Sequence, residues 1–100
     1  MEHRFGRRFA VFESVRLRAL AGEVTEAALM EISLSGARLR TSVRWPMMCP
    51  LHVLLPPAED SRGSATVVAA RVIRHADDGI AVEWLDLAPL PVQVRLRGRS

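Results

Sequence analysis

The residues of this chain best suited to bind a ligand fall into two short segments. Arg4 and Arg8 stand near the N-terminus, and a polar hexapeptide follows at residues 31–36. A guanidinium group presents a rigid fork of donors that matches a phosphate, and serine and glutamate add a hydroxyl and a carboxylate. These groups point to binding of an anionic ligand. The hexapeptide reads Glu31-Ile32-Ser33-Leu34-Ser35-Gly36.

The Arg-x-x-x-Arg spacing is uninformative by itself. All 14 basic residues are arginine, and this frequency gives ~2 such pairs by chance, the usual false-positive risk of a short motif. What distinguishes Arg4 and Arg8 is their place ahead of the first expected strand and of the hexapeptide. The chain contains three such pairs, Arg4/Arg8, Arg40/Arg44 and Arg95/Arg99.

Composition bounds the class of protein. One hundred residues, 49% of them hydrophobic and 25% charged, make one folded domain. Lysine, asparagine and tyrosine are absent, and either selection for phosphate recognition or a GC-rich bacterial genome explains this bias. With a net charge of only +3, the arginine content does not by itself indicate nucleic-acid binding. The single Cys49 excludes an internal disulfide, and without a secretory signal or membrane-length apolar run we expect a cytoplasmic protein.

The sequence gives no sign of an enzyme. Ser33 and Ser35 do not lie in a Gly-x-Ser-x-Gly elbow, and neither a P-loop nor a dinucleotide fingerprint is present. The three histidines lack metal-ligand spacing, and His75 with Asp77 and Asp78 is best read as a solvated hairpin. We therefore expect no catalytic residue, no metal and no cofactor.

The elements that must position these residues are short strands. Alternating apolar and polar residues, separated by turns, predict six strands near 13–19, 24–32, 37–41, 51–55, 65–75 and 80–84. Such a series is typical of an all-β sandwich or barrel, and we expect a six-stranded antiparallel β-barrel because closure protects the sheet edges. Asp77, Asp78 and Gly79 predict a hairpin in which Gly79 is free to take positive φ.

The expected organisation is an N-terminal ligand-binding arm at 1–12, the barrel at 13–89 and a tail at 90–100. The arm is expected to be flexible. The tail alternates like a strand, but Pro91 is equally compatible with the start of a short helix. Trp84 is in phase with Ile80 and Val82 and should lie in the core, whereas Trp45 is expected to be a partly buried loop anchor.

The order of these segments resembles the PilZ domain, the bacterial receptor module for cyclic di-GMP, over roughly residues 3–89. That family has Arg-x-x-x-Arg on an N-terminal arm, followed by Asp/Asn-x-Ser-x-x-Gly between the second and third barrel strands. Here the hexapeptide continues into Ala37-Arg38-Leu39, a run also typical of the family. The segments at 71–74 and 79–87 resemble the family's last two strands.

The resemblance implies a nucleotide-binding site for second-messenger signalling, built from Arg4, Arg8, Ser33 and Gly36. The two arginines would hold phosphate or guanine, Ser33 would donate to the ligand or satisfy its own turn, and Gly36 would allow a close backbone approach or form a turn. Arg7 could substitute for or assist one of the two arm arginines, or it could be an exposed, solubilising charge. We also expect Arg74 to be a ligand-binding residue.

Glu31 departs from the pattern, because the family has Asp or Asn at this position. A carboxylate here can accept from guanine N–H groups, but the extra methylene changes its reach. Glu31 therefore has three outcomes open to it: a different contact with the ligand, crowding of the site, or an ion pair with an arm arginine.

The leading hypothesis is a cyclic di-GMP receptor that signals to an unidentified effector protein by ordering its arm. One alternative is a PilZ-like interaction module that does not bind the dinucleotide, which Glu31 motivates. The other is a small nucleic-acid-binding barrel, disfavoured because the chain has few aromatic residues for base stacking. We expect no nucleic-acid polymer and no membrane as partners, and a homodimer is left open.

Overall fold

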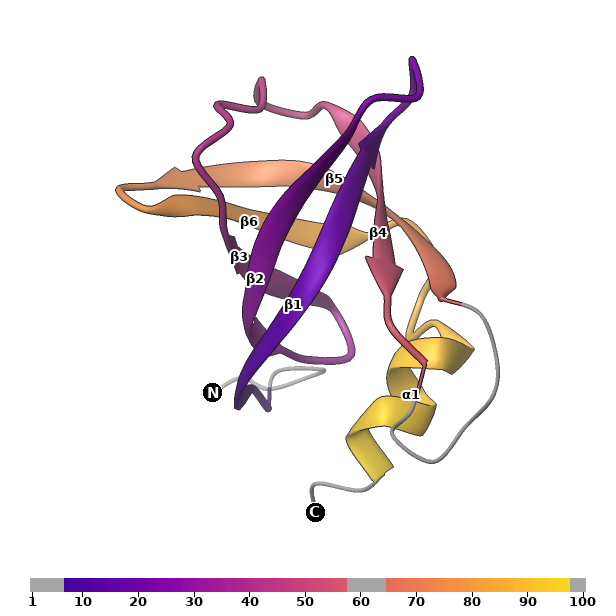
Figure 1. Ribbon diagram of the computed structural model, residues 1–100. Helices are drawn as coiled ribbons and strands as arrows, with labels where there is room; N and C mark the ends of the chain where they lie inside the picture. Colours follow the sequence, from indigo (N-terminus) through magenta and orange to yellow (C-terminus); the bar gives the residue numbers. More distant parts are fainter. Residues whose placement is uncertain (1–6, 58–64, 98–100) are drawn as a thin grey trace.

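The protein forms a closed antiparallel barrel of six strands with one helix at its C-terminal end (Figure 1). This computed structural model describes residues 7–57 and 65–97. The strands follow one another around the barrel in the order β1-β2-β3-β6-β5-β4, and β4 pairs with β1 to close it. The predicted fold class is confirmed. The elements are β1 (Phe9–Ala19), β2 (Val24–Ile32), β3 (Gly36–Arg40), β4 (Pro50–Leu55), β5 (Thr66–Ala76), β6 (Gly79–Trp84) and α1 (Leu90–Arg97).

The core follows from the period-two pattern of the strands. Along β4, Leu51, Val53 and Leu55 point inward and are at most 1% exposed. Trp84 is buried in this core as predicted, at 6% exposure. Trp45, in the loop before β4, is more deeply buried than expected, at 5%, and its carbonyl accepts a hydrogen bond from Nε2 of His75 at 2.6 Å. His75 thus anchors a loop.

Strand β1 begins at Phe9, four positions ahead of the expected start at 13. Phe9 pairs with Ile32 and Ala10 with Glu31, so residues 9–12 belong to the barrel and not to an arm. The alternation is hidden in the sequence because Phe12 is apolar yet 81% exposed and Glu13 is charged yet half-buried. The pairing with β2 also shifts register between Ala10 and Glu13, as in a β-bulge. Residues 1–6 of the expected arm, Arg4 among them, lie outside the described part of the chain.

Gly79 forms the end of the predicted hairpin but does not take the positive φ that glycine permits there. Among the described glycines only Gly22, in the β1–β2 turn, has positive φ, at 107°. Gly79 is instead required by close packing, because a β-carbon there would lie 1.9 Å from the carbonyl oxygen of Leu39. A β-carbon on Gly36 would lie 2.1 Å from the carbonyl oxygen of Val82. The two glycines sit at opposite ends of the β3–β6 ladder and allow these strands to approach.

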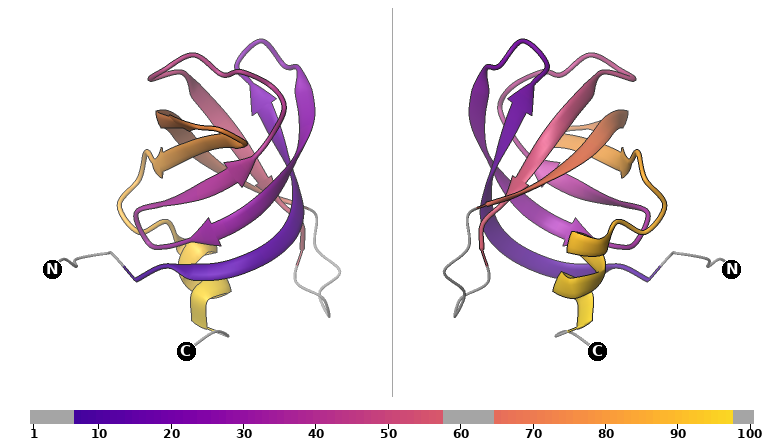
Figure 2. Two further views of the ribbon diagram at one scale, coloured as in Figure 1. Left: turned by 90° about the vertical axis from the view of Figure 1, so that its left-hand side faces the viewer. Right: turned by 90° about the vertical axis from the view of Figure 1, so that its right-hand side faces the viewer.

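Helix α1 occupies one end of the barrel, so the tail, which the sequence left open between strand and helix, is helical (Figure 2). Val92 is fully buried against the core. Arg95 pairs with Glu13 of β1, and its Nη1 donates to the carbonyl oxygen of Pro56 at 3.0 Å. Within residues 7–57 and 65–97, no helix has the length and apolar character needed to cross a membrane.

Candidate functional site

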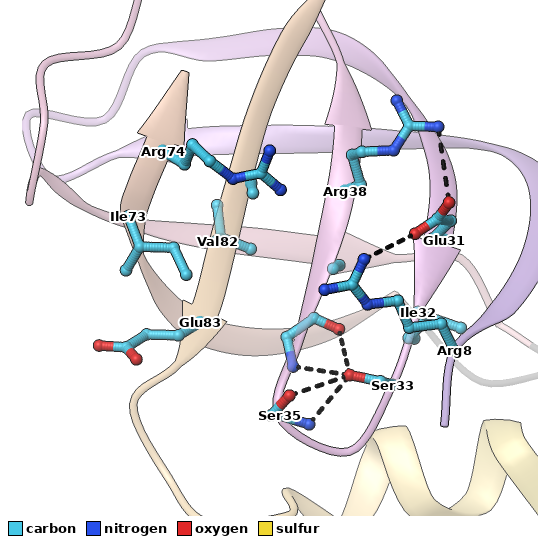
Figure 3. A pocket seen from close by; sticks show the side chains of 13 residues that line it. Arg8, Glu31, Ile32, Ser33, Ser35, Arg38, Ile73, Arg74, Val82 and Glu83 are labelled. Carbon is cyan, nitrogen blue, oxygen red and sulfur yellow. Dashed lines mark hydrogen bonds and ion pairs between the residues drawn. The ribbon is translucent and has the colours of Figure 1, made fainter. Parts of the chain in front are cut away.

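The candidate site is a pocket on the outer surface of β2, β3, β6 and β5, beside the β2–β3 turn (Figure 3). Three arginines and two glutamates line it, so its formal charge is positive. The turn, the small side chains of β3 and β6, and two isoleucines, Ile32 of β2 and Ile73 of β5, form the rest of the lining. The charged residues of the lining are Arg8, Glu31, Arg38, Arg74 and Glu83.

The strand register aligns four lining residues in one row across the barrel. Glu31 lies opposite Arg38, Arg38 opposite Ala81, and Ala81 opposite Arg74. Neighbouring strands lie about 4.8 Å apart, so the two arginines flank Ala81 from the strands on either side of it. Because the alanine side chain ends at its methyl group, the surface is depressed at Ala81, between the two long cationic side chains.

Two register shifts produce this row. One lies between Leu29 and Glu31 of β2, and the other lies between Val72 and Arg74 of β5. Each inserts an extra residue, which changes the side chains that face outward beyond it. On β5 the result is that Ile73 and Arg74 are consecutive exposed residues, and both line the pocket.

Glu31 forms ion pairs with both of its arginine neighbours. Its Oε1 lies 3.6 Å from Nη1 of Arg8, and its Oε2 lies 3.7 Å from Nη2 of Arg38. The pairs continue from Arg38 to Asp78 on the β5–β6 hairpin at 3.9 Å, and from Asp78 to Arg40 at 3.7 Å. Of the three outcomes considered for Glu31, the ion pair with the arginine ahead of β1 is the one observed.

The hydroxyl of Ser33 is engaged by its own turn. Oγ accepts from the backbone N–H groups of Ser35 at 3.2 Å and of Gly36 at 3.3 Å, and it lies 3.1 Å from Oγ of Ser35. Ser33 is 5% exposed. Nε1 of Trp84 donates to its carbonyl oxygen at 3.0 Å, which ties the turn to β6. Serine at this position therefore builds the wall of the pocket.

A family model described as the PilZ domain matches residues 2–96. The chain belongs to the PilZ domain family. PilZ domains are receptor and adaptor domains for cyclic di-GMP, and the sequence resemblance stated above is thereby confirmed at the level of the family. No curated protein matches the chain.

The other predicted residues of the PilZ site are found in different environments. Arg8 and Arg74 line the pocket, and within the described ranges Arg74 has no carboxylate partner. The guanidinium carbon of Arg7 lies 5.2 Å from the centre of the Phe9 ring, and Arg7 is absent from the pocket lining. Gly36 lines the pocket, but its missing β-carbon makes room for β6.

Sequence reasoning on this PilZ domain did not include Arg38 among the candidate residues, although Arg38 lines the pocket. The signal was present, because Arg38 stands between the buried residues Ala37 and Leu39 and must point outward. The sequence does not show which residue of β2 lies opposite it, since the bulge after Leu29 sets that register. Among the residues with described positions, no cluster of His, Cys, Asp or Glu is suited to hold a metal ion.

Proposed function

We propose that this PilZ domain binds cyclic di-GMP in the pocket beside the β2–β3 turn and serves as a cytoplasmic, non-catalytic receptor or adaptor. The observation that carries the proposal is the meeting of Arg8, from the chain just ahead of β1, and Arg74, from β5, in one pocket with the turn of the hexapeptide. The ligand carries two phosphates and two guanines, and guanidinium groups can fork onto either.

Each arginine has a separate part in the proposed complex. Among the residues that the structure describes, none forms an ion pair with Arg74, so its guanidinium is suited to receive a phosphate or the O6/N7 edge of guanine. Arg8 is 66% exposed and approaches from the opposite side of the pocket. Ile73, exposed next to Arg74, provides an apolar surface for a base or ribose. Arg4 completes the pair on the arm in this proposal, although it lies outside the described residues.

The energetics favour binding that is coupled to folding of the arm. Ordering about five residues costs on the order of 5–10 kcal/mol. Each charge-assisted hydrogen bond contributes roughly 1.5–3 kcal/mol, and a micromolar affinity requires about −8 kcal/mol. Several contacts must therefore form together. The ordered arm would present a new surface next to β1, to which an effector protein binds.

Titration calorimetry with cyclic di-GMP tests the proposal directly. We expect saturable heat, and Arg8→Ala should abolish it. Arg16→Ala is the matched control, because Arg16 lies on the outer face of β1 and is absent from this pocket. An absence of heat at about 100 μM protein, where even a binding free energy of about −5.5 kcal/mol is detectable, would contradict the proposal.

A second candidate function is a protein-interaction module that does not bind the dinucleotide. The ion pairs of Glu31 favour it, since this carboxylate already engages two arginines of the pocket. In that case a partner captured from cell extract should bind equally well with and without cyclic di-GMP, and equally well to the Arg8→Ala variant. Loss of the partner on either change supports the receptor function instead.

A further inference from the structure

Five charged side chains form a continuous series along one edge of the pocket. In spatial order they alternate in sign, and each oxygen of Glu31 faces a different arginine. Arg38 is shared between Glu31 and Asp78, so its guanidinium is held between two carboxylates. The series consists of Arg8, Glu31, Arg38, Asp78 and Arg40.

The contacts in this series are loose. The N···O distances run from 3.6 to 3.9 Å, longer than the 2.7–2.9 Å or so of a charge-assisted hydrogen bond. A tight pair exists on the same surface for comparison, since Nε of Arg71 donates to Oε2 of Glu83 at 2.5 Å. The two ion pairs of Glu31 are thus held mainly by charge. Arg8 is 66% exposed, so solvent screening weakens its pair with Glu31 further.

We propose that Glu31 is an internal counter-ion that holds Arg8 and Arg38 in the free protein and is displaced by the ligand. A phosphate can accept short, paired hydrogen bonds from an arginine, whereas Glu31 makes only the long contacts described above. Binding is then an exchange of ion pairs, in which Arg38 becomes a ligand contact. This inference rests on the proposed function for the identity of the ligand, but the restraint on Arg8 exists without any ligand.

Asp78, on the β5–β6 hairpin, is a second carboxylate that restrains Arg38. It holds Arg38 from the side opposite Glu31, and it also faces Arg40. Removing its charge should loosen Arg38, which keeps its ion pair with Glu31, and should leave Arg8 paired with Glu31. Both carboxylates hold Arg38, but only Glu31 pairs with Arg8, so their neutralisation should differ in its effect on the segment ahead of β1.

The affinity test compares Glu31→Gln, Asp78→Asn and the control Glu26→Gln by calorimetry with cyclic di-GMP at low and high salt. Glu26 lies on the same strand, away from this pocket. Exposed ion pairs are weak, so we expect roughly a two- to tenfold tightening for Glu31→Gln and a smaller one for Asp78→Asn. The differences should shrink in 0.5 M salt, since screening weakens the internal pairs.

Weaker binding by Glu31→Gln would show that the carboxylate is a ligand contact and would overturn the inference. Unchanged binding at low salt would also overturn it, because a counter-ion that restrains two arginines must affect their release. If Glu31→Gln binds cyclic di-GMP and the wild type does not, the result would support a strong restraint of Arg8 and Arg38 by Glu31. In every case Glu26→Gln should follow the wild type within twofold.

A measurement without ligand separates this inference from the proposed function. Trypsin cleaves after arginine, and mass spectrometry can follow cleavage after Arg7 and Arg8 in the free protein. We expect faster cleavage in Glu31→Gln and wild-type rates in Asp78→Asn and Glu26→Gln. If no variant binds cyclic di-GMP, the proposed function fails, and these cleavage rates still decide whether Glu31 restrains Arg8. Equal rates in all four proteins would overturn the restraint.

Discussion

Nε1 of Trp84 donates a hydrogen bond to the carbonyl oxygen of Ser33 at 3.0 Å, and this buried contact links the core to the wall of the candidate site. Trp84 is the last residue of β6, and Ser33 opens the β2–β3 turn. The backbone N–H of Trp84 also donates to the carbonyl oxygen of Ser35 at 3.0 Å. The β2–β3 turn that lines the pocket is thus held by two hydrogen bonds from Trp84 of β6.

Trp84→Phe should therefore destabilise the protein and loosen the turn. Phenylalanine keeps an aromatic ring in the core but cannot donate, which leaves the buried Ser33 carbonyl unsatisfied. We expect a loss of about 1–3 kcal/mol in the free energy of unfolding, beyond any cost of the smaller ring. Urea denaturation measures this loss, and hydrogen exchange at the amides of Ser35 and Gly36 should become faster. Wild-type exchange in the variant would contradict the link.

Gly36→Ala should be costly for a steric reason. Its β-carbon would lie 2.1 Å from a backbone oxygen of β6, so the two strands must separate. We expect a loss of about 2–4 kcal/mol, comparable to severe overpacking. Gly22→Ala is the informative comparison, because Gly22 has positive φ but no atom near its missing β-carbon. It should cost only about 1–2 kcal/mol, and an equal loss for both would argue against the strand contact.

Ala81→Leu should block the pocket without unfolding the barrel. Ala81 lies between Arg38 and Arg74 on the outer face, so a larger side chain there extends into the pocket proposed to bind the ligand and not into the core. We expect at least a tenfold loss of cyclic di-GMP affinity by calorimetry. Ala69→Leu, on the outer face of β5 opposite His52, is the control and should bind like the wild type. Full binding by Ala81→Leu would remove this pocket from consideration.

Val92→Ala should destabilise the barrel through helix α1. Val92 is fully buried, and truncation removes apolar contact and leaves a small cavity. A loss of about 1–3 kcal/mol is expected in thermal or urea unfolding. Val94→Ala is the matched control on the same helix, because Val94 is 53% exposed and should change stability by no more than about 0.5 kcal/mol. Similar losses in both variants would mean that α1 does not pack as described.

The sequence by itself determined the strands, the hexapeptide and the family. Alternation is a local property, so β4 and β6 could be located from residues such as Leu51, Val53 and Val82 without knowledge of their partners. The predicted start of β1 at 13 is four residues late, because Phe12 is apolar yet exposed and Glu13 is charged yet half-buried, so residue type does not follow the alternation there. The family pattern likewise depends only on residue order along the chain.

Only the tertiary structure decided how the site is built. Which residue faces which across a ladder depends on bulges and on barrel closure, and these fix the row from Glu31 through Arg38 and Ala81 to Arg74. The same register brings Glu31 within reach of Arg8 and Arg38. It also gives Gly36 a packing role that its sequence context did not reveal, because the oxygen that excludes a β-carbon belongs to Val82 on another strand. The sequence specifies which side chains are present, whereas their proximity depends on the pairing of strands that are distant along the chain.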